Sequence, residues 1–181
     1  LLAICASLQI LGHWYTDARN RKVDGLGLLD LTTRPQGKRS IGELVVQPEI
    51  DGLSEPLTGF ENHGGGSQLG PDARPLGKVL FGKGNSILPP AGFDEQSSSP
   101  DEAALKVSRI DGAVQGSIIA TYLHGPVLAR NPQLADLLLE RALGHKLEPL
   151  EVPGVAELRR ERLAATISRP ELRERLERHE R

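Results

Sequence analysis

The sequence predicts an α/β protein, in which short strands alternate with helices. Apolar runs with the length of a buried strand stand at residues 1–4 and 118–123, and a helical pattern follows each of them. Glycine-rich turns separate further strand-like segments between these runs. The 181 residues suit one domain, which we predict at 1–150, followed by a charged helical tail at 151–181.

The first strand is joined to a helix through Cys5, the only cysteine of the chain. A helix is predicted over Ala6–Tyr15, and the small residues Ala6 and Ser7 allow strand and helix to approach closely. Such a turn places the thiol at the carboxyl end of a sheet, near the positive end of a helix dipole, which favours the thiolate. The sequence therefore predicts a nucleophile. The alternative is a buried core cysteine.

The middle of the chain is predicted to be rich in strands. Residues 20–35 are expected to form loop and a short strand, and Arg39 is placed in a short loop before a strand at 41–46. Further strands are predicted at Leu44–Gln47, Leu57–Glu61 and Leu76–Phe81. The stretch at about 82–107, with its Pro and Ser runs, is predicted to be a surface insertion, and a lid or partner contact is the alternative.

His124 ends the last predicted strand, Ile118–Leu123, and is followed by Gly125 and Pro126. Catalytic groups of open α/β sheets gather at strand ends, so His124 is the candidate base for Cys5. The alternative is a histidine that satisfies backbone groups in a turn.

Two helical segments close the chain. One is predicted over Asn131–Leu143, with Asn131 as N-cap, Pro132 in the first turn and Gly144 at the end. The tail from Val155 to Arg181 is predicted to be helical and divided at Pro170. It is either a solvated helix with i,i+4 ion pairs or a docking helix for a partner.

Composition excludes several classes of function. The net charge of −2 gives no reason to expect nucleic acid or membrane binding. No apolar run approaches the roughly 20 residues of a membrane span, and no Cys/His cluster has the spacing of metal ligands. A single cysteine precludes an internal disulfide and suits a reducing compartment, so a cytoplasmic location is expected.

Five segments of the chain together carry a resemblance to a known family. They are Cys5-Ala6-Ser7-Leu8-Gln9, Gly25–Asp30, Arg39–Glu43, Gly59–Gly65 and Tyr122–Pro132. They resemble signatures of class I glutamine amidotransferases of the cobyric-acid-synthase-like group, in the same order, over about residues 1–145. The combination is most similar to the glutaminase (GatD) subunits of lipid II isoglutaminyl synthases.

The resemblance implies a three-layer, flavodoxin-like amidotransferase domain whose amino-terminal half is missing from this chain. That half would include the Gly-rich loop with the second oxyanion donor. A sheet with an unpaired edge and half a core would have poor independent stability.

The resemblance also implies an activity. Glutamine would be hydrolysed through a cysteine thioester, with Cys5 as nucleophile, His124 as base and the backbone N–H of Ala6 as an oxyanion donor. Arg39 would hold the α-carboxylate of glutamine through its two-pronged guanidinium, and Gln9, about one helical turn after Cys5, would contact the substrate.

Partner and cofactors follow from the same resemblance. Ammonia would pass to a Mur-ligase-like synthase subunit of the MurT type, which forms a heterodimer with the glutaminase and amidates the D-glutamate of lipid II to D-isoglutamine. No metal or cofactor is expected on this chain, whereas ATP and magnesium are expected on the partner.

Asn62 and His63 are expected on a Gly-rich turn after a strand. There they would either line the pocket or hold the turn, and the residues alone leave both open.

Two departures from the family pattern are informative. Ala6-Ser7 replaces Gly-Gly, which would distort the oxyanion hole if that turn needs a positive φ. No glutamate follows His124 at a two-residue spacing, so we expect an unoriented imidazole in this chain, with the third catalytic group supplied by the partner.

Two alternatives to the isoglutaminyl synthase glutaminase stay open. They are an amidotransferase of cobalamin synthesis and a non-catalytic regulatory subunit.

Overall fold

The computed structural model describes residues 1–17, 19–86, 109–148, 150 and 153–167, and it confirms the α/β class. The first of two sheets contains β1 (Leu2–Ile4), β8 (Ala113–Gln115) and β9 (Ile118–Thr121). β9 lies in its centre, parallel to β1 and antiparallel to β8.

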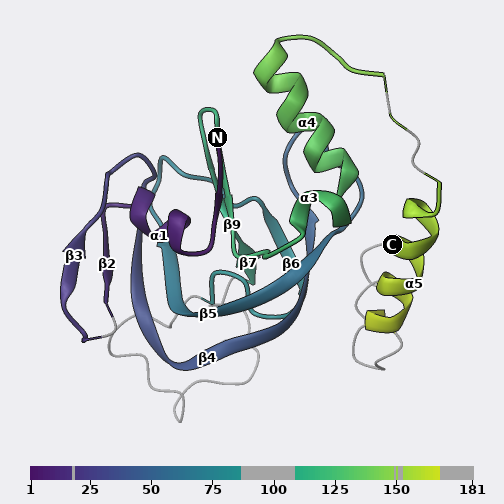
Figure 1. The fold of residues 1–181 in the computed structure, drawn as a ribbon. Coiled ribbons are helices and arrows are strands. Elements are labelled where there is room, and N and C mark those ends of the chain that lie inside the picture. Colours follow the sequence, from purple (N-terminus) through teal and green to yellow (C-terminus); the bar gives the residue numbers. More distant parts are fainter. Residues whose placement is uncertain (18, 87–108, 149, 151–152, 168–181) are drawn as a thin grey trace.

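The second sheet is larger and mixed. Its strands are β2 (Trp14–Thr16), β3 (Lys22–Asp24), β4 (Leu31–Pro48), β5 (Leu57–Leu69), β6 (Gly77–Phe81) and β7 (Ile110–Asp111). The order is β3-β2-β4-β6-β7, and β5 pairs with β4 along nearly its whole length. Figure 1 shows β4 and β5 as two long, bent ribbons.

Four helices are described. They are α1 (Ala6–Leu11), α3 (Val127–Arg130), α4 (Pro132–Leu143) and α5 (Val155–Ile167). α1 follows β1 directly, and α3 and α4 follow β9, so both strands of the central parallel pair lead toward helices (Figure 1). Of the predicted tail, α5 is helical as expected and residues 168–181 lie outside the described residues, as does most of the predicted insertion at 82–107.

The first predicted helix is too long. α1 ends at Leu11, whereas the sequence predicts a helix to Tyr15. At Gly12 the chain passes close to β4, because a Cβ there would lie 2.6 Å from Leu31 Cδ1. Trp14 and Tyr15 then pair with Thr32 and Thr33, so cross-strand pairing overrides the local helical pattern.

Two of the middle strands are longer than predicted, whereas the strand predicted at Leu76–Phe81 is confirmed as β6. Leu44–Gln47 and Leu57–Glu61 are confirmed as strand, but each is only part of β4 or β5. The prediction of a Gly-rich turn at Asn62 and His63 is wrong, because β5 continues through them and through Gly64–Gly66. The loop predicted at Arg39 is likewise absorbed into β4 as an irregularity, since pairing resumes on both sides of it.

The helix predicted at Asn131–Leu143 is confirmed as α4, with Gly144 in the left-handed conformation at its end (φ 76°). Asn131 occupies the N-cap position without a side-chain capping bond. Its buried carboxamide instead accepts from the Thr58 N–H (2.8 Å) and donates to the Thr58 and Val127 carbonyls (2.8 and 2.7 Å). Asn131 therefore ties α3 and α4 to β5.

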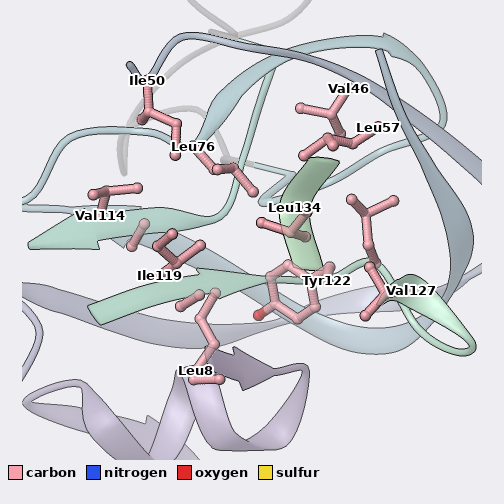
Figure 2. Close-up of a cluster of buried hydrophobic side chains, with 14 of the residues drawn as sticks. Leu8, Val46, Ile50, Leu57, Leu76, Val114, Ile119, Tyr122, Val127 and Leu134 are labelled. Atoms are coloured by element: carbon pink, nitrogen blue, oxygen red, sulfur yellow. The ribbon is translucent and has the colours of Figure 1, made fainter. Parts of the chain in front are cut away.

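The core lies between the two sheets and the helices that follow β1 and β9. Figure 2 shows Leu8 of α1, Ile119 of β9 and Leu134 of α4 in one cluster, together with Tyr122. Tyr122 is fully buried, and its hydroxyl oxygen lies on the side of the ring nearer Leu8. The largest buried aromatic side chain thus comes from the residue directly after β9.

Asp111 is a fully buried carboxyl group in β7. It accepts hydrogen bonds from Thr121 Oγ1 (2.5 Å) and from the Tyr122 N–H (3.3 Å). Burial, with a smaller contribution from the Glu61 carboxylate, raises the pKa of Asp111 to about 6 against the lowering effect of these hydrogen bonds. Asp111 therefore ties β7 to the end of β9 at the cost of a buried charge above that pH.

This pKa predicts a pH dependence of stability. In the unfolded chain Asp111 ionises near its ordinary pKa of about 3.9. Between that pH and about 6 the folded state binds the proton more tightly, so the free energy of unfolding falls as pH rises through this window, by about 3 kcal/mol from this group. In Asp111→Asn, which cannot ionise at this position, this fall in the free energy of unfolding should be absent. Urea unfolding at pH 4 and pH 7 checks it, and parallel pH curves for the two proteins would contradict it.

Candidate active site

Cys5 lies on a strained turn between β1 and α1. Its φ of 52° and ψ of −109° are outside the regions that L residues ordinarily adopt. Its N–H donates to the Thr121 carbonyl (2.9 Å), which extends the β1–β9 ladder by one residue. Strained backbone of this kind at a strand–helix junction is typical of positions that present a nucleophile.

Ala6 and Ser7 do not distort this turn. The positive φ falls on Cys5 itself, whereas Ala6 and Ser7 are the first two residues of α1. Alanine and serine are compatible with helical backbone, so the replacement of Gly-Gly leaves the local conformation unstrained at these two positions.

The electrostatics of the thiol are balanced between burial and two favourable groups. Half-burial is the largest effect and raises the pKa of Cys5, while the Ala6 backbone N–H and the positive charge of Arg39 lower it. The net shift is upward, contrary to the expectation that the turn by itself favours the thiolate. A base is therefore needed to remove the thiol proton.

His124 is oriented by backbone carbonyls. Its Nδ1 lies 2.8 Å from the Tyr122 carbonyl oxygen and 3.0 Å from that of Phe60. Carbonyl oxygens only accept, so Nδ1 carries a proton, and in the neutral imidazole Nε2 then carries the lone pair that a general base needs. Within the described residues Nε2 forms no hydrogen bond. The imidazole expected to be unoriented is therefore held in one tautomer by this chain.

The parallel pairing of β1 with β9 brings the two predicted catalytic residues to one edge. Ile4 pairs with Thr121, so Cys5 and the segment Tyr122–His124 leave the sheet at the same end. β5 meets them there, because His124 and Phe60 form an antiparallel bridge. This edge is the candidate active site.

Arg39 reaches the site from the irregularity of β4. Pairing shifts between Pro35 and Ser40, which face Gly65 and His63, so four residues of β4 stand opposite one residue of β5. The exposed Arg39 donates from Nε to Asn62 Oδ1 (2.6 Å) and from Nη2 to the Asn62 carbonyl (3.4 Å). Asn62 thus orients the guanidinium whose charge acts on Cys5.

Gln9 is linked to a buried chain of hydroxyls. Its Nε2 donates to the Tyr122 hydroxyl (3.2 Å), which contacts Ser67 Oγ (2.7 Å), and Ser67 contacts Thr33 Oγ1 (2.8 Å). Burial raises the pKa of Tyr122 to about 12, so its hydroxyl keeps its proton. The Gln9 side chain is therefore held on the core side by the buried Tyr122 hydroxyl.

The sequence did not indicate a role at the site for Tyr122, for Ser67 or for Glu61, the buried partner of His63. His63 does not line an open pocket: it is buried, contacts Glu61 Oε2 through Nε2 (3.1 Å) and stacks on Tyr122. An alternation of polar residues in 57–69 is the one signal that could have indicated an inward-facing polar row.

No group of three or more His, Cys, Asp or Glu side chains that could hold a metal occurs within the described ranges. Among the helices that the structure describes, none is long and apolar enough to cross a membrane.

A thiol on a strained strand–helix turn, at the same sheet edge as a histidine with its Nε2 lone pair open, is an arrangement suited to nucleophilic cysteine chemistry. The chain belongs to the family of CobB/CobQ-like glutamine amidotransferase domains, whose family model matches residues 1–132.

Two curated relatives are both described as GatD subunits. The chain is 34% identical over 160 residues to the GatD subunit of the glutamine-hydrolysing lipid II isoglutaminyl synthase of Staphylococcus aureus, covering 87% of this chain and 56% of the relative. It is 31% identical over 170 residues to that of Streptococcus pneumoniae, covering 93% and 57%. The chain thus spans a little over half the length of these relatives.

Other matches are more distant. A probable cobyric acid synthase of Methanothermobacter thermautotrophicus is 34% identical over 136 residues, which are 69% of this chain and 23% of that protein. The match to a solved glutamine amidotransferase structure from Thermotoga maritima covers 98% of this chain and 60% of the Thermotoga chain, at 19% identity and a TM-score of 0.38.

Gly65 provides a test of how tightly Gln9 is packed. A Cβ at Gly65 would lie 2.7 Å from Thr33 Cγ2 and 2.8 Å from Gln9 Nε2, whereas one at Gly64 meets nothing within 4 Å. We expect Gly65→Ala to lower the free energy of unfolding by about 1–3 kcal/mol through overpacking. Gly64→Ala, the matched control, should stay within about 0.5 kcal/mol. Urea unfolding of both variants measures this, and equal effects would contradict the packing.

Proposed function

We propose that this protein is a glutaminase, which hydrolyses L-glutamine to glutamate and ammonia through a thioester on Cys5. The observation that carries the proposal is the shared edge: Cys5 and His124 follow strands that pair in parallel, and the Nδ1–H of His124 is taken up by backbone carbonyls. Membership of the amidotransferase family supports the same reaction.

The chemistry follows from the residues. His124 Nε2 takes the thiol proton, and the Cys5 sulfur attacks the side-chain amide carbon to give a tetrahedral oxyanion. The Ala6 N–H, which faces the Cys5 sulfur, is placed to donate to that oxyanion. Collapse expels ammonia, which takes the proton from His124, and water then hydrolyses the thioester by the same route.

Substrate binding is assigned to Arg39 and Gln9. The guanidinium of Arg39, braced by Asn62, would hold the α-carboxylate of glutamine through charge-assisted hydrogen bonds. Its charge also lowers the pKa of the Cys5 thiol, so one residue serves binding and activation. Gln9, anchored on Tyr122, would contact the bound substrate from α1.

The similarity to GatD subunits supports a destination for the ammonia. We propose that it passes to a Mur-ligase-like synthase subunit of the MurT type in a heterodimer. ATP and magnesium would act on that subunit, which would amidate the D-glutamate of lipid II in the cytoplasm. A partner carboxylate near His124 would stabilise its imidazolium better than two carbonyls can.

A second candidate is an amidotransferase of cobalamin synthesis, favoured by the identity of 34% to a probable cobyric acid synthase over 69% of this chain. It would release the same ammonia from glutamine, pass it to a different acceptor and carry a fused synthetase domain upstream.

Ammonia release from L-glutamine, measured on the protein co-expressed with its Mur-ligase-like partner, tests the reaction. Cys5→Ala removes the nucleophile and should lower the rate by about 1,000-fold or more. Ser7→Ala, an exposed position two residues further on, is the matched control and should leave the rate within about twofold. Release that persists in Cys5→Ala would refute the thioester route. A folded complex with no release would favour the regulatory-subunit alternative.

A further inference from the structure

Tyr122 is fixed in the core at three points. Its N–H donates to Asp111 Oδ1 (3.3 Å), its hydroxyl contacts Ser67 Oγ (2.7 Å), and its ring stacks on His63 with centroids 3.8 Å apart and an interplanar angle of 20°. The residue is fully buried (Figure 2). Such a side chain has one position only.

The His63 imidazole that stacks on Tyr122 is held in place by a buried pairing with Glu61. The His63 and Glu61 side chains are 1% and 3% exposed. Glu61 accepts from the backbone N–H groups of Lys83 (2.8 Å) and Gly84 (3.0 Å). Both His63 nitrogens face acceptors, Glu61 Oε2 at 3.1 Å and the Gly65 carbonyl at 2.9 Å. The imidazole therefore cannot rotate without breaking a hydrogen bond in a buried site.

From this fixed position Tyr122 contacts both halves of the proposed site. Its hydroxyl accepts from Gln9 Nε2 (3.2 Å), and its carbonyl accepts from His124 Nδ1 (2.8 Å). The first contact is made by the side chain and the second by the main chain. One residue thus sets the place of the proposed substrate contact and the tautomer of the proposed base.

We propose that Tyr122 is a positioning residue for glutamine hydrolysis, which aims Gln9 at the substrate through its hydroxyl and His124 at the thiol through its carbonyl. This inference rests on the proposed glutaminase function. Because the two contacts use different atoms, side-chain substitution separates them. Loss of the hydroxyl removes the contacts with Gln9 and Ser67, while the carbonyl keeps orienting His124, so the kinetic effect should fall on substrate binding.

Tyr122→Phe tests the inference in the co-expressed complex. We expect the KM for L-glutamine to rise about 3- to 10-fold, with kcat within twofold and the pH dependence of kcat unchanged. In a Gln9→Ala background the same substitution should change KM by less than about twofold, because both changes break one contact. Tyr15→Phe, the same chemical change in β2, is the matched control and should leave KM and kcat unchanged.

The outcomes separate the inference from the proposed function. Suppose that the complex releases ammonia. If Tyr122→Phe then leaves KM unchanged, or if the effects of Tyr122→Phe and Gln9→Ala on KM multiply in the double variant, the positioning role is wrong and the glutaminase stands. If there is no release, the glutaminase is wrong, and calorimetric binding of L-glutamine to Cys5→Ala protein tests the Gln9 contact by itself. An equal Kd with and without Tyr122→Phe, or no binding, overturns that contact as well, and a Kd weakened 3- to 10-fold supports it.

Discussion

The parallel pairing of β1 with β9 is the constraint on which the site depends. Residues 2–4 pair with 119–121, so Cys5 and the segment after Thr121 emerge at one edge. The Cys5 N–H to Thr121 bond carries the ladder into the turn and holds the strained φ in place. A register shift of one residue would turn the side chains of β1 to the other face and separate thiol from histidine.

Beneath that edge, polar groups are buried in pairs rather than singly. Glu61 faces His63 and two backbone N–H groups, and Tyr122 is held between His63 and Ser67. Buried polar groups are costly unless satisfied, and satisfied ones specify a single arrangement. This network gives the half-buried thiol, whose pKa is raised, a rigid set of neighbours.

The sequence predicts well what is local. The Cys5 turn, β9 before His124 and the helix ending at Gly144 each have their signal within about ten residues, and each is confirmed as a structural element. What depends on distant partners was not predictable. The helix over 6–15 was shortened by pairing with β4, and the turn at Asn62 became strand because β4 continues opposite it. The carbonyls that face His124 Nδ1 carry no sequence signature at all, since every residue has one.

The distance along the chain between the paired strands also has a consequence in time. Residue 4 finds its partner only when residue 121 has been made, and at roughly 5–20 residues per second that takes on the order of 6–23 s on the ribosome. Throughout that interval Cys5 is separated from His124, so the candidate site cannot yet form. Assembly of the candidate site therefore waits for β9, the strand that joins β1 to β8.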